Sequence, residues 1–334
     1  MINVGVVGTS WITEEFIKGA NLVEEFKLSS VYSRNIDNAK SFADKYNLTN
    51  VFTDLEEMAR SPYIDAVYIA SPNSFHAEQA IIFLKNKKHV LCEKAIASTV
   101  KELNLMIEAA KDNGVLLMEA MKSAFLPNFK VIEDNIHKLG IVRRFFISYC
   151  QYSSRYDTYK AGEAVNTFDP KFSNGSIMDI GVYCIHPILR LFGMPNSVNA
   201  SSLKLESGVD GQGALMLGYD NMDGIIIHSK IADSQLPSEI QGEKGTMIID
   251  KINNTERVKI IYRDGSNEDI SVSQLKETMY YEAKEFIELI KNGKGESEIN
   301  SYNQSLMVME IIEKARKQTG IEFPSDKRIV RKQL

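Results

Sequence analysis

Strand-like and helix-like patterns alternate along the first 120 residues of the chain. Short apolar runs rich in β-branched residues predict buried strands at residues 2–7, 28–32, 65–70, 89–92 and 115–118. Apolar positions at helical spacing predict helices between them, at residues 35–46, 54–60, 73–85 and around 103–110. Strands and helices in strict alternation imply right-handed crossovers and one parallel sheet that is covered on both faces.

The pattern changes after Pro127. Long period-two runs predict strands at residues 142–149, 198–205, 213–219, 224–231, 246–249 and 258–262, with hairpin turns at 220–224 and 263–265. Helices are predicted at 176–192, 275–290 and 302–318. The expected fold is therefore α/β: a doubly wound parallel sheet in a first domain, residues 1–121, and an α+β second domain, residues 122–334, with a large, mostly antiparallel open sheet. The C-terminal helices could pack back on the first domain.

The first strand ends at Gly8, and a helix follows. Backbone N–H groups at such a helix start lack partners and carry partial positive charge, which suits a pyrophosphate. The turn Gly8-Thr9-Ser10-Trp11-Ile12 is therefore a candidate dinucleotide site. Ser10 and Thr13 stand where the G-x-G-x-x-G template has its second and third glycines, so an ordinary buried βα turn is an equal alternative for this element alone.

The second strand ends at Ser33-Arg34, where a dinucleotide-binding unit reaches the adenosine ribose. An acidic residue here would accept a hydrogen bond from the 2′-hydroxyl of NAD. A hydroxyl and a guanidinium instead favour the 2′-phosphate of NADP. NAD stays open, because Arg34 could be only a surface charge.

Composition narrows the classes further. The 334 residues are 44% hydrophobic and 25% charged with net charge −5, as is ordinary for a soluble enzyme. No basic cluster indicates nucleic-acid binding, and no leader or long apolar run predicts a membrane segment, so a cytoplasmic protein is expected. The three cysteines are far apart and predict reduced thiols, and the histidine spacing predicts no metal site.

Two segments carry candidate chemistry. Glu93-Lys94 directly follows a predicted strand, where the lysine could donate a hydrogen bond or proton to a substrate oxygen; a solvated loop pair is the plain alternative. Asp179, Tyr183 and His186 are spaced i, i+4 and i+7, so on a regular helix they project from one face. They could position and protonate an alcohol or carbonyl oxygen, or they could simply be helix-start and interface residues.

Several motifs together resemble the glucose-fructose oxidoreductase and inositol dehydrogenase (Gfo/Idh/MocA) family over nearly the whole chain. They are Gly5 to Ile12, Val31 to Arg34, Ala70 to Gln79, Glu93-Lys94, Leu117 to Ala120 and Asp179 to Tyr183. Within the family the chain most resembles the dimeric dihydrodiol dehydrogenases, in which a tyrosine stands where inositol dehydrogenases have histidine.

The resemblance implies an N-terminal Rossmann domain, a C-terminal α/β domain whose open sheet makes a homo-oligomer (dimer or tetramer), and a nicotinamide cofactor. It assigns catalysis to Lys94, Tyr183 and Asp179. Tyr183 donates or accepts the proton, Lys94 activates Tyr183, and Asp179 is their orienting partner. Cofactor contacts are implied at residues 8–12, 33 and 34, at Ser71, Pro72, Asn73 and His76, and at Glu93 and Lys94. Substrate contacts are implied at Tyr183, His186 and Lys122. For His76 a plain helix-start role stays open.

The chain departs from the family at five positions. Ala95 replaces the proline after the lysine, so Lys94 could be aimed less rigidly. Ala124 and Thr167 stand where arginines are common, and Lys122 could substitute for one of them. Asn174 replaces a glycine but tolerates left-handed backbone. Ser10 adds a Cβ near the phosphates. These changes put the substrate class and turnover in question.

The sequence therefore predicts an NADP-preferring dehydrogenase or reductase of a small sugar, polyol, dihydrodiol or carbonyl compound. A cofactor-binding regulatory protein without turnover is the alternative from another class. A reductase of a large conjugated ligand such as a bile pigment is a third possibility.

Overall fold

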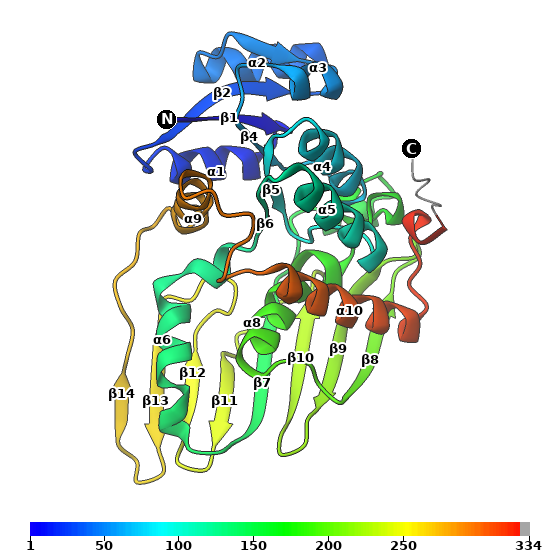
Figure 1. Cartoon of the computed structure of the whole chain (residues 1–334). Helices are drawn as coiled ribbons and strands as arrows, with labels where there is room; N and C mark the ends of the chain where they lie inside the picture. The colour runs from blue at the N-terminus through cyan, green and yellow to red at the C-terminus, as the bar shows by residue number, and fades with distance from the viewer. Residues whose placement is uncertain (328–334) are drawn as a thin grey trace. The chain divides into compact units, whose positions relative to one another are not determined.

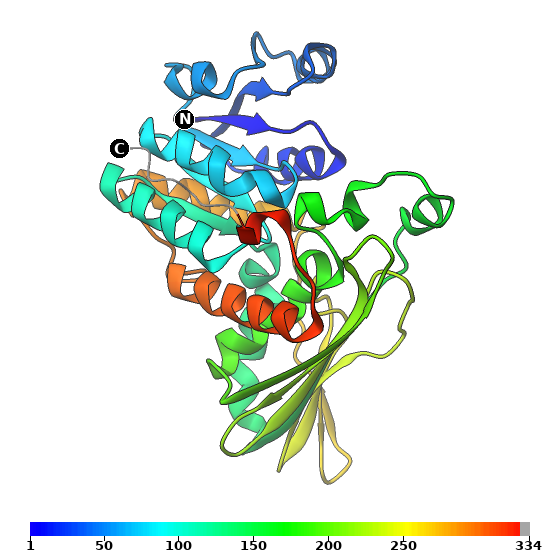
Figure 2. The same ribbon diagram turned by 90° about the vertical axis from the view of Figure 1, so that its right-hand side faces the viewer.

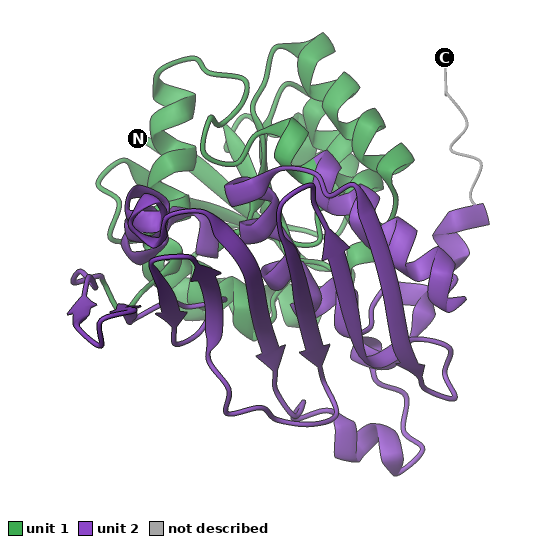
Figure 3. Ribbon diagram, turned by 90° about the horizontal axis from the view of Figure 1, so that it is seen from below, with its two compact units in different colours: residues 1–122, 275–305, 332–334 green, residues 123–274, 306–331 purple. Residues whose placement is uncertain are grey.

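The computed structural model describes residues 1–327. The described chain forms two compact units (Figure 3): residues 1–122 with 275–305, and residues 123–274 with the segment that begins at residue 306.

The first unit is built on a six-stranded sheet in which every pairing is parallel. Its strands are β1 (Ile2–Val7), β2 (Phe26–Tyr32), β3 (Asn50–Phe52), β4 (Ala66–Ile69), β5 (His89–Glu93) and β6 (Leu117–Ala120). Their spatial order is β3-β2-β1-β4-β5-β6 (Figure 1). The order reverses between β1 and β4, which is where doubly wound sheets bind dinucleotides.

Helices connect these strands. They are α1 (Trp11–Ala20), α2 (Ile36–Tyr46), α3 (Leu55–Arg60), α4 (His76–Lys85) after a 3₁₀ turn at Asn73–Phe75, and α5 (Val100–Asn113). Side chains of Asn35, Asp54 and Thr99 accept backbone N–H groups at the starts of α2, α3 and α5. Asn47 and Gly114 end α2 and α5 in the left-handed conformation.

Helix α9 (Met279–Lys291) belongs to this first unit although it comes late in the chain. It packs against α1 at Gly19, where a Cβ would lie 2.6 Å from the backbone nitrogen of Tyr280. Glycine is thus what lets the two helices approach. The contact explains why residues 275–305 group with the first unit rather than with the sequence that precedes them.

The second unit is built on an eight-stranded sheet with the order β14-β13-β12-β11-β7-β10-β9-β8. Its strands are β7 (Val142–Cys150), β8 (Ser197–Lys204), β9 (Asp210–Gly218), β10 (Asp223–Ser229), β11 (Ser238–Gly242), β12 (Gly245–Ile249), β13 (Val258–Tyr262) and β14 (Asn267–Asp269). Only β7 and β10 pair in parallel. The predicted combination of a parallel sheet and a mostly antiparallel sheet is confirmed.

Helices of the second unit lie on one face of this sheet (Figure 2). They are α6 (Pro127–Asn135), a π-helix at Ile177–Gly181 that continues into α8 (Val182–Phe192), and α10 (Tyr302–Thr319) from residue 306 onward; the short α7 (Tyr156–Lys160) lies in a loop. Alternate strand residues such as Phe145, Leu215 and Ile226 are buried under these helices. Their neighbours Phe146, Met216 and Ile225 point to the other face and keep exposed surface.

The structure corrects several predicted elements. The expected regular helix over 176–192 is wrong in its first turn, which is a π-helix, and α9 begins at Met279 rather than at residue 275. Strand β6 lies two residues later than predicted. Helix α6 and strands β3, β11 and β14 were not predicted, because each is short or lacks a clear period. None of the helices within residues 1–327 combines the length and apolar character needed to cross a bilayer.

Candidate active site

In the first unit the predicted cofactor residues follow the carboxyl ends of four neighbouring strands. Residues 8–12 follow β1, Ser33 and Arg34 follow β2, Ser71 to His76 follow β4, and Glu93 and Lys94 end and follow β5. Lys122 comes just after β6. Because parallel strands end at one edge of a sheet, the topology brings these segments to that edge.

The turn after β1 requires its glycine. Gly8 has a φ of 107°, and a Cβ there would lie 2.9 Å from the carbonyl oxygen of Ala70 at the end of β4. The buried hydroxyl of Thr13 donates to the Gly8 carbonyl over 3.2 Å, so a threonine closes the turn where the template has its last glycine. Ser10 is exposed, and its side chain does not cap α1. The accessible, uncapped start of α1 fits a phosphate group.

Arg34 is exposed after β2, and its guanidinium lies 5.2 Å from the ring centre of Phe75 in the turn before α4. A guanidinium stacked on a ring keeps its edge N–H donors free to bind an anion. The Ser33 hydroxyl accepts the Asn35 amide over 3.3 Å. Arg34 is thus a cation at the end of β2, and the ring of Phe75 holds its guanidinium.

His76 is completely buried and connects two of these loops. Its Nε2 lies 2.7 Å from the Ser71 carbonyl oxygen, and its Nδ1 lies 3.0 Å from that of Ala95. Burial lowers the pKa of His76 to about 4, against the two carbonyl contacts. His76 therefore ties the loop after β4 to the loop that carries Lys94.

The loop after Lys94 is held on its other side by buried carboxylates. The Ile96 amide donates to Glu119 over 3.1 Å, and the Ser98 amide donates to Glu102 over 3.0 Å. The Lys94–Ala95 peptide bond is cis. Lys94 itself is partly exposed. These contacts hold the loop without the proline ring whose absence is expected to leave Lys94 less rigidly aimed.

Glu93 and Glu282 are further buried acidic groups of the first unit. Burial raises the pKa of Glu93, against the charge of Lys94 and a hydrogen bond from the Tyr68 hydroxyl. Glu282 on α9 has no exposed surface, and neither of its carboxyl oxygens has a hydrogen-bond partner among residues 1–327. Burial, followed by the charge of Glu93, raises the pKa of Glu282 well above its usual range.

In the second unit the predicted catalytic side chains lie on the π-helix and the start of α8. The Asp179 side chain is 31% exposed, Tyr183 is 9% exposed and His186 is fully buried. The π-turn changes the helical spacing between Asp179 and Tyr183, and the common face of the three side chains stays a prediction. The Tyr183 ring packs edge-on against Tyr149 of β7, with ring centres 6.0 Å apart.

Lys230 is an unpredicted member of this group. It directly follows β10, is only 6% exposed, and forms an ion pair with the carboxylate of Asp179. No sequence signal identifies it, since a single lysine after a strand is usually a surface residue.

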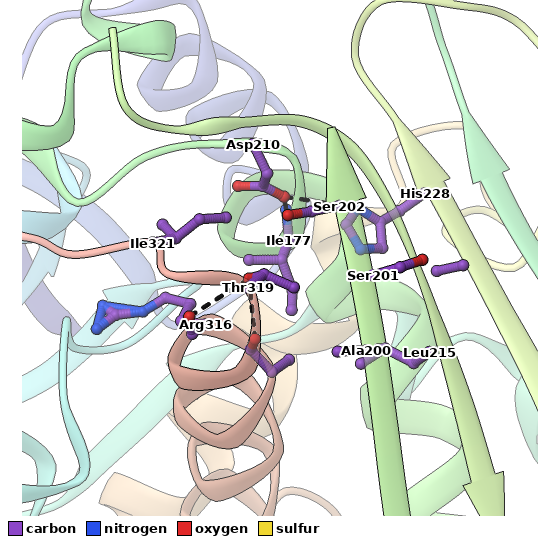
Figure 4. A pocket seen from close by; sticks show the side chains of 12 residues that line it. Ile177, Ala200, Ser201, Ser202, Asp210, Leu215, His228, Arg316, Thr319 and Ile321 are labelled. Carbon is purple, nitrogen blue, oxygen red and sulfur yellow. Dashed lines mark hydrogen bonds and ion pairs between the residues drawn. The ribbon is translucent and has the colours of Figure 1, made fainter. Parts of the chain in front are cut away.

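The buried carboxyl of Asp210 lies beside the π-helix (Figure 4). Asp210 accepts the Ile177 amide over 2.7 Å, and a Cβ on Gly175 would collide with its carboxyl oxygen. Burial raises the pKa of Asp210 to about 6, against hydrogen bonds from backbone amides. The neighbouring His228, whose pKa burial lowers to about 3, has its Nδ1 2.8 Å from the Ser176 hydroxyl.

The cavity at Asp210 is about 10 Å³, which is room for a single water molecule and not for a metabolite. The role of Asp210 is therefore to support the π-helix. The structure also moves the left-handed backbone expected at Asn174: Ser173 and Gly175 have positive φ, and Asn174 does not.

The strand order, the glycine turn and the chemistry at the sheet edge define a dinucleotide-binding oxidoreductase. Residues 2–121 match the family described as "Oxidoreductase family, NAD-binding Rossmann fold", and residues 136–248 match the "GFO/IDH/MocA C-terminal domain". The chain belongs to the Gfo/Idh/MocA oxidoreductase family, which confirms the predicted family, fold class and NAD(P)-dependent oxidoreductase activity.

Relatives span the whole chain. The scyllo-inositol 2-dehydrogenase (NADP(+)) IolU of Bacillus subtilis is 54% identical over 98% of this chain and 99% of its own length. A trans-1,2-dihydrobenzene-1,2-diol dehydrogenase of Xenopus tropicalis is 28% identical, with coverage of 96% and 98%. Identity is thus higher to an inositol dehydrogenase than to this dihydrodiol dehydrogenase.

A solved structure shares the fold of the described chain. The aldose-aldose oxidoreductase of Caulobacter crescentus in complex with glycerol superposes with a TM-score of 0.84 at 20% identity, covering 96% of this chain and 97% of that one.

Asp210→Asn should remove a pH dependence of stability. The folded pKa of Asp210, about 6, lies above its ordinary value of 3.8, so the protonated carboxyl stabilises the fold fully below pH 3.8 and this contribution is lost as the pH rises through 6. Relative to Asp210→Asn, the wild-type protein should lose on the order of 2 to 3 kcal/mol of unfolding free energy between pH 4 and pH 7. Urea unfolding at both pH values measures this.

The exposed carboxyl of Asp134 in the same unit provides the control, since Asp134→Asn should leave the pH dependence nearly unchanged. Parallel stability curves for wild type and Asp210→Asn would contradict the predicted titration.

Proposed function

We propose that this chain is an NADP-dependent dehydrogenase of a cyclic polyol of the inositol type. The proposal rests mainly on the 54% identity, over nearly the full length of both chains, to a protein named as an NADP-dependent scyllo-inositol 2-dehydrogenase. The cation at the end of β2 supports the choice of NADP over NAD.

The residues at the edge of the first sheet fit a dinucleotide. Gly8 leaves room where a Cβ would meet the end of β4, and the start of α1 offers backbone amides to the pyrophosphate. We assign the turn of residues 8–12 to the pyrophosphate, Ser33 and Arg34 to the 2′-phosphate, and Ser71, Pro72, Asn73, Glu93 and Lys94 to the nicotinamide half. His76 holds the last two loops together. When bound, the nicotinamide supplies or accepts the hydride.

We assign the proton chemistry to Lys94, Tyr183 and Asp179. In carbonyl reduction the Tyr183 hydroxyl gives its proton to the substrate oxygen and becomes the phenolate, and in alcohol oxidation the Tyr183 phenolate takes the proton of the substrate hydroxyl. The ammonium of Lys94 stabilises the negative oxygen that each transfer leaves. Asp179, paired with Lys230, is a carboxylate and accepts a hydrogen bond from a substrate hydroxyl. Lys122 is assigned to substrate binding; the buried His186 stays a prediction.

Two alternative functions can be distinguished from the proposed dehydrogenase. A regulatory protein of the same fold would bind NADPH without turnover, and the full-length similarity to a named dehydrogenase argues against it. A bile-pigment reductase has no support among these relatives.

We also propose a homo-oligomer through the uncovered face of the second unit's sheet. Apolar side chains with exposed surface gather on that face: Phe146, Leu203, Met216, Ile225, Ile227, Ile248 and Ile261. Several partly exposed apolar side chains on one sheet face favour a protein–protein contact there. A second copy would bury it, because the same strip on each copy is self-complementary.

The main test is oxidation of scyllo-inositol with NADP⁺, followed by NADPH absorbance. The wild-type protein should turn over, and Tyr183→Phe should lower kcat by about 100- to 10,000-fold while NADPH binding stays within about twofold. Tyr302→Phe, which removes a hydroxyl bonded to Gly295, is the control and should keep kcat. Tight NADPH binding by a wild-type protein that oxidises none of a panel of inositols, sugars and dihydrodiols would favour the regulatory alternative.

Arg34→Ala should weaken NADPH binding by about 10- to 100-fold and leave NADH binding nearly unchanged, because a charge-assisted contact to the 2′-phosphate is lost. Fluorescence titration of both nucleotides measures the difference. Arg60→Ala, which removes an exposed arginine on α3, is the control. Equal losses for both nucleotides would show that Arg34 does not contact the 2′-phosphate.

The double variant Phe146→Glu/Met216→Glu should dissociate the oligomer, since paired carboxylates at the centre of the apolar face repel their counterparts. Light scattering after size exclusion should give the 37.6 kDa chain mass for the variant and a multiple of it for wild type. Leu22→Glu changes an exposed apolar residue of the other unit and should have no effect. A wild-type mass equal to one chain would refute the proposal.

A further inference from the structure

We propose that Lys230 is a positioning residue of the active site, which holds Asp179 as an oriented carboxylate for a substrate hydroxyl. This inference rests on the proposed function, because it gives Lys230 a role in polyol turnover. Nothing in the sequence pattern or in the relatives' names assigns that role.

The ion pair is asymmetric. The Lys230 side chain is only 7% exposed, whereas that of Asp179 is 31% exposed. An ammonium this buried is costly unless it is paired. Lys230 forms an ion pair with Asp179. The buried partner is thus the lysine, and the accessible partner is the residue that the family resemblance assigns to catalysis.

The backbone of Lys230 is fixed from both sides. Its amide donates to the Gly211 carbonyl over 2.8 Å, and its carbonyl accepts the Ser153 amide over 2.9 Å. The preceding Ser229 hydroxyl accepts the amides of Ile231 and Ala232 over 3.2 and 3.0 Å. The lysine therefore extends from a rigid point at the end of β10, which limits the positions its ammonium can take.

Asp179 needs such an anchor. It lies in the middle of a π-helix, where side-chain directions are not fixed by the regular α-helical spacing. The backbone of this turn is held by Asp210 at Ile177 and by the Asp179 amide, which donates to Gly175 over 3.1 Å. Lys230 completes the arrangement by fixing the carboxylate itself.

The pair also defines what Asp179 can do. A carboxylate neutralised by a buried ammonium stays ionised and only accepts hydrogen bonds. It can therefore orient a hydroxyl of a polyol without competing with Tyr183 for the proton.

Lys230→Met should lower kcat/KM for scyllo-inositol by about 10- to 100-fold, since a charge-assisted contact to substrate is disordered. The Kd for NADPH should stay within about twofold. Lys230→Arg should recover much of the loss, because a guanidinium keeps the charge. Lys138→Met, which breaks the ion pair of Lys138 with Glu268 in the same unit, is the control and should behave as wild type.

A double-mutant cycle separates positioning from a structural role. If Lys230 acts through Asp179, adding Lys230→Met to Asp179→Asn should cost less than about threefold in kcat/KM beyond Asp179→Asn alone. Losses that multiply, or a Lys230→Met enzyme as active as wild type, would overturn the inference. The double variant leaves no buried charge unpaired, so it also covers the case in which Lys230→Met alone fails to fold.

The two proposals fail in different ways. A wild-type protein that binds NADPH but oxidises no polyol contradicts the proposed function, and the role of Lys230 falls with it. A wild-type protein that oxidises scyllo-inositol, together with an unaffected Lys230→Met, contradicts the role of Lys230 alone.

Discussion

Backbone amides that no helix or strand can satisfy are the constraint around which the candidate site segments of each unit are built. In the first unit, the loop after Lys94 turns its Ile96 amide inward, and the buried carboxyl of Glu119 accepts it. In the second unit, the buried carboxyl of Asp210 accepts the Ile177 amide at the start of the π-helix. Each of these amides lies two residues from a proposed catalytic side chain, Lys94 or Asp179.

The use of buried carboxyls to accept these backbone amides has an electrostatic consequence. Burial raises the pKa of Glu119 and that of Asp210 to about 6, so both carboxyls are costly to keep ionised in the folded protein. Asp179 differs, because it is partly exposed and paired with an ammonium. The structure thus separates the buried carboxyls of Glu119 and Asp210, which support backbone, from the accessible carboxylate of Asp179, and the separation follows from burial and pairing rather than from residue type.

The sequence predicts the topology well and the site only in part. Alternating patterns and the Gly8 turn predict the parallel sheet, because strand and glycine signals are local. The π-helix, Lys230 and Asp210 could not be predicted, since each depends on a contact between residues 30 or more apart in the chain. Glu282 leaves a weaker trace: it is a charged residue within the apolar stripe of α9, beside the buried Ala283 and Phe286.

The replacement of proline by Ala95 shows how tertiary contacts can take over a local constraint. Proline would fix the backbone after Lys94 by its own ring. Here the Ala95 carbonyl contacts His76, the Ile96 amide donates to Glu119 and the Ser98 amide donates to Glu102. Three contacts over four residues leave the loop little freedom, so the departure from the family pattern does not by itself argue for a protein without turnover. An argument against catalysis would have to rest on other departures, such as Ala124 and Thr167, which stand where the family commonly has arginine.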